Sequence, residues 1–547
     1  MKTCFNVISG RLLLAGVILV AAGWNCYGQQ TVFGLLRNNL KLADKYYEEN
    51  NFQGALDLCL RASREKDPSP DLQLRIARCY YSLKQYREAI AHYGGYIKLK
   101  RNLPWTDIYY YAEAQASTGN YNTAVGYYRK YLGKDSDDEL IIKKIWRLSN
   151  IEYLFEDSAH YEVRRVPINT ESGELCAVPY RDGIVFMSNR KEPQLVEKVN
   201  ASINAPFYRT YYSKVLRDGS GIGTTRYGEV SSFNKMFASN FNAGPVAFYD
   251  KDRKMVFVST ATEAGKEGTR TLQIHFAEMT DGQWKISGEF PFNSVQYSIS
   301  DPAISEDGRT LYFSSDIGGG FGGRDLYKST LDSGKWSRPV NLGEMINTRN
   351  DEASPYLHQN RTLYFSSNGH PGLGGLDIFQ AAIKSDGFSE PRNAGYPINS
   401  GYDDFGIVID SLETHGYFSS NRNKGGYDDD LYEFDMDVQT YPVTITGLVK
   451  YKERAWSDSS ELKVMPRAKI YLIDNLRNVQ VQERQSDANG NFSVVVPYFS
   501  QYVVRVVGED GGESVVVLEI PRHRKQLGAH EIVIVKDVFE SNNNQVR

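Results

Sequence analysis

Two internal repeats of different period divide this chain, and they constrain its fold more than any other feature. In the first repeat, aromatic residues stand 34 and 35 residues apart at Phe52, Tyr86 and Tyr121. Small residues keep the same intervals at Ala43, Ala77 and Ala112, and again at Ala55, Ala89 and Ala124. Small side chains let two helices cross closely, and an aromatic side chain before the second helix fills the space between them. Residues 33–155 are therefore predicted to form a stack of helix pairs.

This period and pattern resemble the tetratricopeptide (TPR) repeat, which builds an α-solenoid. Residues 137–154 are acidic at their start and amphipathic, so we expect them to form the capping helix that such a stack needs. The resemblance implies a concave groove that holds a peptide or a partner helix through Asp44, Tyr47, Arg78, Tyr81 and Glu113. The alternative is that these side chains form a solvated face of mixed charge.

The second repeat covers residues 160–440 and has a period of about 50 residues. The sequence LYFSS at 311–315 returns at 363–367, and GYFSS follows at 416–420. Weaker copies are VFVST at 256–260 and VFMSN at 185–189. Each strong copy is followed by a turn and a second strand, and further on by an Asn-Ser or Asn-Thr turn, as at Asn347-Thr348. A unit of this length holds about four short strands, the size of one propeller blade.

The segment 301–329, in which Pro302 opens the first strand and Asp307-Gly308 makes a hairpin turn, resembles the PD40 blade of TolB-like β-propellers. The last unit lacks a fourth strand, and YEVRRVPINT at 161–170 matches the outer strand of the other units. We therefore expect the N-terminal segment to complete the last blade. This predicts five blades, with six as the alternative if the long first unit hides another. Its surplus residues within 190–243 are predicted to be a loop that contacts a partner.

Residues 442–540 alternate between apolar and polar positions in several short runs, and the Asp487–Gly490 segment between two of them is typical of a hairpin turn. The pattern resembles the carboxypeptidase regulatory-like β-sandwich, a non-catalytic spacer or adhesion module. Residues 541–547 are left as a tail. The expected fold is thus a multi-domain α and β chain with a solenoid, a propeller and a C-terminal sandwich.

The first 28 residues have the form of a removed signal peptide. Lys2 and Arg11 precede the apolar stretch Leu12–Ala22, which is too short to cross a bilayer. Lipidation at Cys26 is the alternative. Three cysteines remain after cleavage, Cys59, Cys79 and Cys176, which are too few for a disulfide framework. We expect them to be small buried side chains. The alternative is a disulfide between Cys59 and Cys79, which lie on neighbouring predicted helices. The mature chain is expected to be periplasmic, with association with the outer membrane as an alternative, and to have no transmembrane span.

The sequence carries no catalytic motif. It has no G-x-S-x-G elbow and no H-E-x-x-H, and its eight histidines are scattered without metal-ligand spacing. We expect no enzyme activity, catalytic residue, cofactor or metal site. Asp325, Asp377 and Asp430 recur once per unit and are expected to bond backbone amides of the adjoining turns, with calcium at 428–430 as the alternative. A net charge of −4 disfavours nucleic acid as a partner.

The order of these modules resembles a recurrent envelope protein of Bacteroidota, some members of which are linked to type IX secretion. In that family an OmpA-like domain usually follows and grips peptidoglycan. This chain ends at Arg547, so we expect neither that domain nor peptidoglycan anchoring. The resemblance implies a scaffold that docks envelope proteins, with type IX secretion components as candidates, through the groove and the propeller loops. A propeller that binds glycans or peptidoglycan fragments at its channel mouth is the alternative.

Overall fold

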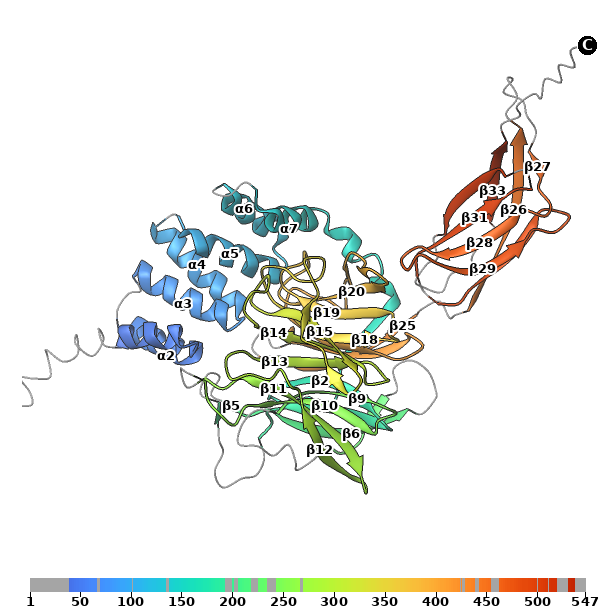
Figure 1. Ribbon diagram of the computed structural model, residues 1–547. Helices are drawn as coiled ribbons and strands as arrows, with labels where there is room; N and C mark the ends of the chain where they lie inside the picture. The colour runs from blue at the N-terminus through green and yellow to red at the C-terminus, as the bar shows by residue number, and fades with distance from the viewer. Residues whose placement is uncertain are drawn as a thin grey trace, which may run out of the picture. The chain divides into compact units, whose positions relative to one another are not determined.

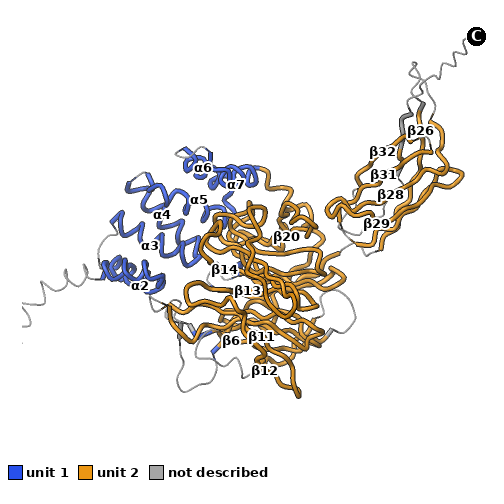
Figure 2. The backbone as a smooth tube through the Cα atoms, viewed as in Figure 1, with its two compact units in different colours: residues 1–149, 191–207, 421–428 blue, residues 150–190, 208–420, 429–547 orange. Residues whose placement is uncertain are grey.

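A computed structural model gives the fold of residues 39–65, 69–100, 102–133, 137–191, 199–200, 205–217, 225–233, 243–265, 269–423, 425, 428–437, 442–453, 462–498, 500–509, 511–518 and 530–536. The predicted signal peptide, Cys26 and the tail at 541–547 lie outside these residues. The chain divides into two compact units (Figure 2). The first consists of residues 1–149, 191–207 and 421–428, and the second of residues 150–190, 208–420 and 429–547.

Helices make up most of the first unit (Figure 1). After the helical residues 39–48 come α2 (Phe52–Glu65), α3 (Pro70–Ser82), α4 (Tyr86–Lys100), α5 (Trp105–Ser117), α6 (Tyr121–Leu132) and α7 (Glu139–Ser149). Phe52, Tyr86 and Tyr121, which were predicted to precede the second helix of each pair, are the first residues of α2, α4 and α6. Ala43, Ala77 and Ala112 are buried. The small residues thus lie where the helices pack most closely.

The expected capping helix is present as α7, but its outer face is partly apolar. Ile141, Lys144 and Leu148 are buried, whereas Ile142 is 45% exposed and Trp146 is 59% exposed. Among the described residues, no helix is long and apolar enough to cross a membrane. Cys59 and Cys79 are buried free thiols, as predicted, and Cys176 is a partly buried one.

After two short 3-10 helices, η1 (Ile151–Leu154) and η2 (Ser158–His160), the described residues up to Met436 form five antiparallel sheets of four or five strands. The first holds β2 (Glu174–Tyr180), β3 (Gly183–Ser188), β6 (Arg209–Arg217), β7 (Thr225–Tyr227) and β8 (Ser231–Ser232), and β4 (Val199–Asn200) pairs separately with β5 (Ala205–Pro206). The second holds β9 (Ala243–Tyr249), β10 (Lys254–Thr260), β11 (Leu272–Thr280) and β12 (Gln283–Glu289). The third holds β13 (Ile299–Ile304), β14 (Thr310–Ser315), β15 (Asp325–Asp332), β16 (Lys335–Trp336) and β17 (Val340–Asn341).

The fourth sheet holds β18 (Glu352–His358), β19 (Thr362–Ser367), β20 (Asp377–Lys384), β21 (Gly387–Phe388) and β22 (Arg392–Asn393). The fifth, which we name the closing sheet, holds β23 (Asp404–Ile409), β24 (His415–Ser420), β25 (Asp430–Met436) and β1 (Tyr161–Arg165). The first strands of the five sheets contact one another in a closed order, β2 to β9, β13, β18, β23 and back to β2. This is the ring of sheets that a propeller requires.

The N-terminal strand closes the ring, as predicted from the repeat. β1 pairs antiparallel with β25, from Tyr161 opposite Met436 to Arg165 opposite Tyr432. Arg165 donates two hydrogen bonds to the Asp430 carboxylate, at 2.9 and 2.8 Å. The Asn169 side chain then bonds both the N–H and the C=O of Leu431, each at 2.8 Å.

The same asparagine contact recurs in three other sheets, at the turns where the sequence shows Asn-Ser or Asn-Thr. Asn293 bonds the N–H and C=O of Ile274, Asn347 those of Leu326, and Asn399 those of Ile378. We name this contact the asparagine clasp. A single amide side chain replaces two ladder hydrogen bonds on the third strand of the sheet, which explains why the turn repeats in the sequence.

A buried carboxyl group begins the first strand of three sheets. Glu352, which is fully buried, accepts hydrogen bonds from the Thr348 N–H and hydroxyl at 2.8 and 2.7 Å and from the Ser367 hydroxyl at 2.7 Å. Glu174 and Asp404 hold the same positions opposite Thr170 and Ser400. Burial raises the pKa of Glu352 to about 7 despite these hydrogen bonds.

One sequence expectation for this region is wrong. The surplus residues within 190–243 were predicted to be a loop, but β6 is the third strand of the first sheet, with Arg209 to Lys214 opposite Ser188 to Gly183. β7 and β8 pair with β6 in turn. The segment 209–217 alternates in a way that suits a strand, yet it lacks the glycine turn and aspartate that mark this strand in the later units.

The C-terminal strands form two sheets around one core. These strands are β26 (Val443–Glu453), β27 (Lys463–Val464), β28 (Lys469–Asp474), β29 (Val479–Gln485), β30 (Asn491–Val496), β31 (Tyr502–Val507), β32 (Glu513–Leu518) and β33 (His530–Lys536). β27, β26, β30 and β33 make one sheet, and β29, β28, β31 and β32 make the other. Ile445, Val449, Ile470, Leu472 and Val504 lie in their shared core. The predicted turn is present, since the Gly490 N–H bonds the Asp487 C=O at 3.0 Å, but the prediction of a hairpin is wrong, because β29 pairs with β28 and β30 pairs with β26 of the other sheet.

The asparagine clasp that Asn169 makes in the closing sheet should contribute measurably to stability. We expect Asn169→Ala to lower the free energy of unfolding by about 1–2 kcal/mol, because the N–H and C=O of Leu431 lose their side-chain partner. Urea-induced unfolding measures this change. Gln296→Ala, in an exposed turn, is the matched control and should change stability by less than about 0.5 kcal/mol. Equal effects of the two variants would contradict the role of the clasp.

The buried Glu352 should make stability depend on pH. A carboxyl group with a raised pKa in the folded state stabilises fully below its unfolded pKa, and this stability is lost as the pH rises through the folded value. The free energy of unfolding should therefore fall between about pH 4.5 and about pH 7. Glu352→Gln should flatten this part of the profile, measured by denaturation across the pH range. Glu344→Gln, which is exposed, should retain the full slope.

Candidate functional site

The five residues predicted to line the helical groove lie on the first helix of each helix pair. Their side chains contact the helices that follow in the stack. Asp44 forms an ion pair with Arg75 of α3. The Tyr47 hydroxyl lies 3.1 Å from the Ser82 hydroxyl at the end of the same helix. The first pair is therefore joined to the second by one ionic and one neutral contact.

The second pair is joined to the third through Arg78 and Tyr81. Arg78 donates from Nε and Nη2 to the two oxygens of Asp107 on α5, at 2.8 and 2.6 Å. The Tyr81 ring stacks on Tyr110 with centroids 4.6 Å apart. The hydrogen bonds to Asp107 raise the pKa of Arg78, and burial raises the pKa of Tyr81 well above its ordinary value. Arg78 therefore stays charged and Tyr81 stays neutral in the folded protein.

Glu113 joins the third pair to α7. It is buried, its carboxylate accepts a hydrogen bond from Tyr128, and it lies 2.8 Å from the Lys144 ammonium. Burial alone lowers the pKa of Lys144, but the charge of Glu113 raises it above the usual value, so the pair is ionic. We name the set of contacts made by Asp44, Tyr47, Arg78, Tyr81 and Glu113 the inter-helix ladder. Asp107 was not anticipated, because nothing in the local sequence pairs it with an arginine 29 residues away.

A second candidate site is a cavity of about 550 Å³ at the centre of the ring, which we name the central cavity. Its walls come from the first strands of all five sheets. In each of these strands two residues oppose one residue of the neighbouring strand, which is a β-bulge. The bulges place Cys176, Pro245, Asp301, Ser354 and Gly406 on the cavity wall.

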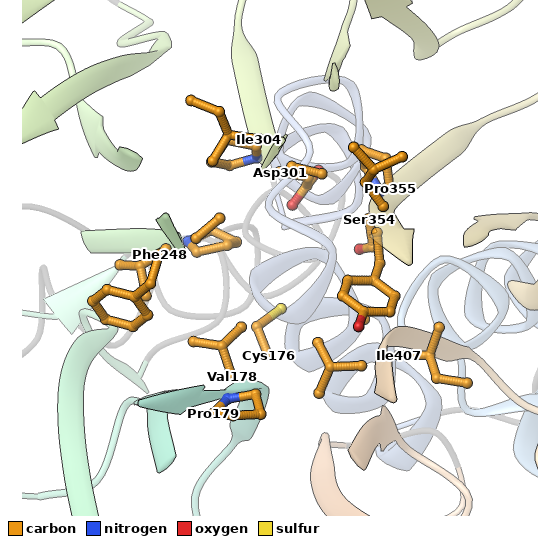
Figure 3. A pocket seen from close by; sticks show the side chains of 18 of the residues that line it. Cys176, Val178, Pro179, Phe248, Asp301, Ile304, Ser354, Pro355 and Ile407 are labelled. Atoms are coloured by element: carbon orange, nitrogen blue, oxygen red, sulfur yellow. The ribbon is translucent and has the colours of Figure 1, made fainter. Parts of the chain in front are cut away.

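Four of these bulges hold a residue at positive φ. The angles are 55° at Cys176, 51° at Asp301, 49° at Ser354 and 64° at Gly406. Only glycine adopts this region freely; aspartate is tolerated there, and cysteine and serine are uncommon. Figure 3 shows the side chains of Cys176 and Asp301 directed into the central space. The dipeptides Gly244-Pro245, Asp301-Pro302 and Ser354-Pro355 mark these bulges in the sequence. The prediction that Pro302 opens the first strand is wrong, because β13 begins at Ile299 and Pro302 lies in its bulge.

The lining is apolar with a few acidic groups. Val178, Ala247, Ile304 and Ile407 form much of the wall, together with the aromatic rings of Phe248 and Tyr356. Asp252, Asp301 and Glu306 are acidic, and no Lys, Arg or His is among the described lining residues. Burial raises the pKa of Tyr356 to about 12, and its hydroxyl donates to the Ile409 C=O at 2.8 Å. Burial also raises the pKa of the Cys176 thiol well above its ordinary value, which keeps it protonated.

The aspartates that repeat once per sheet have mainly structural partners. Asp325 accepts the N–H groups of Phe321 and Gly322 at 2.6 and 3.1 Å, and Asp377 accepts the Gly374 N–H at 3.2 Å. These three hydrogen bonds confirm the predicted backbone role of Asp325 and Asp377. The Asp430 carboxylate pairs with Arg165 of the closing strand. The described residues contain no group of three or more His, Cys, Asp or Glu side chains placed to hold a metal ion.

No family model and no curated protein matches the sequence. Among solved structures, the chain is similar to a protein of unknown function from Dyadobacter fermentans, with 12% identity, 48% of this chain and 77% of that chain covered, and a TM-score of 0.30. An α-L-arabinofuranosidase from Lactobacillus brevis has 11% identity, coverage of 55% and 94%, and a TM-score of 0.30. A Trypanosoma rangeli sialidase has 12% identity, coverage of 67% and 77%, and a TM-score of 0.27. At TM-scores of 0.30 or below, these similarities do not establish the fold.

The inter-helix ladder should stabilise the helical unit. We expect Asp107→Asn to lower the free energy of unfolding by about 2 kcal/mol, because the buried carboxylate makes two charge-assisted hydrogen bonds and a third contact with the Tyr93 hydroxyl at 3.2 Å. Denaturation followed by far-ultraviolet circular dichroism measures the change. Asp57→Asn is the control, since Asp57 is exposed and bonds Gln53 on its own helix. An unchanged Asp107→Asn variant would contradict the ladder.

Proposed function

We propose that this chain is a non-enzymatic periplasmic scaffold that docks envelope proteins, with type IX secretion components as candidates. Docking uses the groove of a TPR solenoid and the loops of a five-bladed PD40/TolB-like propeller. The carboxypeptidase regulatory-like sandwich serves as a spacer or adhesion module. The compartment is proposed from the first 28 residues of the sequence.

The observation that carries the proposal is the inter-helix ladder. Asp44, Tyr47, Arg78 and Tyr81 are partly exposed and are already held by neighbouring helices. Binding normally costs the free energy of ordering mobile side chains at the interface. Because these side chains are ordered beforehand, a partner that meets them loses less free energy on binding. A mixed set of tyrosine, arginine and aspartate also offers both ring faces and charge to a peptide or helix.

The non-enzymatic part of the proposal is supported by the central cavity. Its thiol, Cys176, is kept protonated by burial, and no histidine among the described lining residues could serve as its base. Asp325, Asp377 and Asp430 are engaged by backbone amides or by Arg165.

A photo-crosslinking amino acid in place of Tyr47 tests the docking proposal in cells. We expect it to capture an envelope protein identified by mass spectrometry, and we expect the same residue at Lys98, exposed on α4, to capture none. Adding Asp44→Lys should reduce the yield at position 47 at least threefold, because it reverses a groove charge while removing a partly exposed ion pair of small energetic value. Fractionation of the same cells locates the protein.

Two outcomes would overturn the proposal. One is capture of no envelope protein from position 47. The other is equal capture from positions 47 and 98, which would show contact without a groove. Recovery of the protein in the cytoplasmic fraction would remove the periplasmic assignment.

A further inference from the structure

The residues that line the central cavity include acidic side chains but no basic ones. Asp252, Asp301 and Glu306 line it, and none of the three forms an ion pair with any described residue. The Asp301 carboxylate accepts from the Ser300 hydroxyl at 2.8 Å, Asp252 from the Arg181 N–H at 3.1 Å, and Glu306 from the Lys251 N–H at 2.8 Å. The Ser300 hydroxyl also accepts a hydrogen bond from the Arg324 guanidinium, so Asp301 is linked to a cation through this hydroxyl, but none of the three carboxylates contacts a described cation directly.

Three basic side chains next to the cavity are engaged elsewhere. The Arg181 guanidinium lies over the Tyr180 ring, 5.0 Å from its centroid. Arg253 and Lys254, which follow Asp252 in the chain, contact Asp250 at 2.5 and 3.8 Å. The turn that carries Asp252 also holds the exposed Lys251, whereas no Lys, Arg or His is among the described lining residues of the cavity.

The rest of the wall determines what kind of cation fits. A volume of about 550 Å³ lies in the range of small-molecule sites. Val178, Ala247, Ile304 and Ile407 offer an apolar surface, and Phe248 and Tyr356 add two aromatic rings. A strongly hydrated metal ion gains nothing from such walls, whereas an organic cation gains from burial of its body and from the rings.

We propose that the central cavity binds a small organic ammonium ion with an apolar body. The ammonium group lies against Asp301, and the body lies against the aliphatic and aromatic wall. Asp252 and Glu306 attract the cation toward the cavity. This site rests on the cavity alone and is independent of protein docking by the groove.

Calorimetric titration of the full chain with three molecules of similar shape tests this inference. 2-Phenylethylamine carries an ammonium group, 2-phenylethanol a hydroxyl group and 3-phenylpropanoate a carboxylate on nearly the same body. We expect saturable binding of the amine, binding of the alcohol at least fivefold weaker, and no binding of the carboxylate. Binding of the amine should weaken as the salt concentration rises.

Two variants test whether the cation binds within the cavity. Asp301→Asn removes the central charge and retains a residue that tolerates positive φ, so we expect the amine to bind about five- to tenfold more weakly. Ser354→Asp adds a carboxylate at an equivalent bulge with a positive φ, and we expect tighter binding. Asp332→Asn is the matched control, because it removes the same charge at an exposed position outside the cavity.

Several results would overturn the inference. These are equal affinity for the amine and the alcohol, no saturable binding of the amine, or unchanged amine affinity in both Asp301→Asn and Ser354→Asp. A loss in Asp332→Asn as large as that in Asp301→Asn would also overturn it, since it would show a general effect of surface charge.

Discussion

The ring of sheets depends on the pairing of β1 with β25, because this contact joins residues that are more than 260 positions apart in the chain. Bringing such distant segments together has a conformational cost that local contacts do not have. This cost is offset by the five paired positions of β1 and β25, by the Arg165–Asp430 ion pair and by the asparagine clasp of Asn169 on Leu431. Without β1, β25 would be an exposed strand edge of the kind that pairs with other chains.

The buried carboxyl groups determine where each first strand begins. Glu174, Glu352 and Asp404 each accept hydrogen bonds from a threonine or serine four residues earlier. Burying a carboxyl group is unfavourable unless it is hydrogen-bonded. The strand therefore starts at the one register that satisfies the carboxyl group, and the bulge follows two residues later at Cys176, Ser354 and Gly406.

The sequence predicted the local features of this protein better than the distant ones. The starts of α2, α4 and α6 and the closing role of 161–170 could be predicted because repeated residues mark them several times over. β6 was missed because the first unit does not contain the glycine turn that identifies its counterparts. Of the candidate site, the sequence indicated Asp44, Tyr47, Arg78, Tyr81 and Glu113, but not Asp107 or Lys144, which complete their contacts. Such partners depend on helix packing rather than on any local pattern.

The cavity was missed for a related reason: its lining is a consequence of sheet geometry. A bulge inserts one residue into a strand, increases its local twist and turns an additional side chain toward the ring centre. Because all five first strands carry the bulge, the device that curves the sheets also decides what faces the cavity. Glycine would satisfy the backbone at every one of these positions, as it does at Gly406. Asp301 instead places a charged group there, and its carboxylate is paired with no described cation, so the backbone conformation alone does not explain this residue.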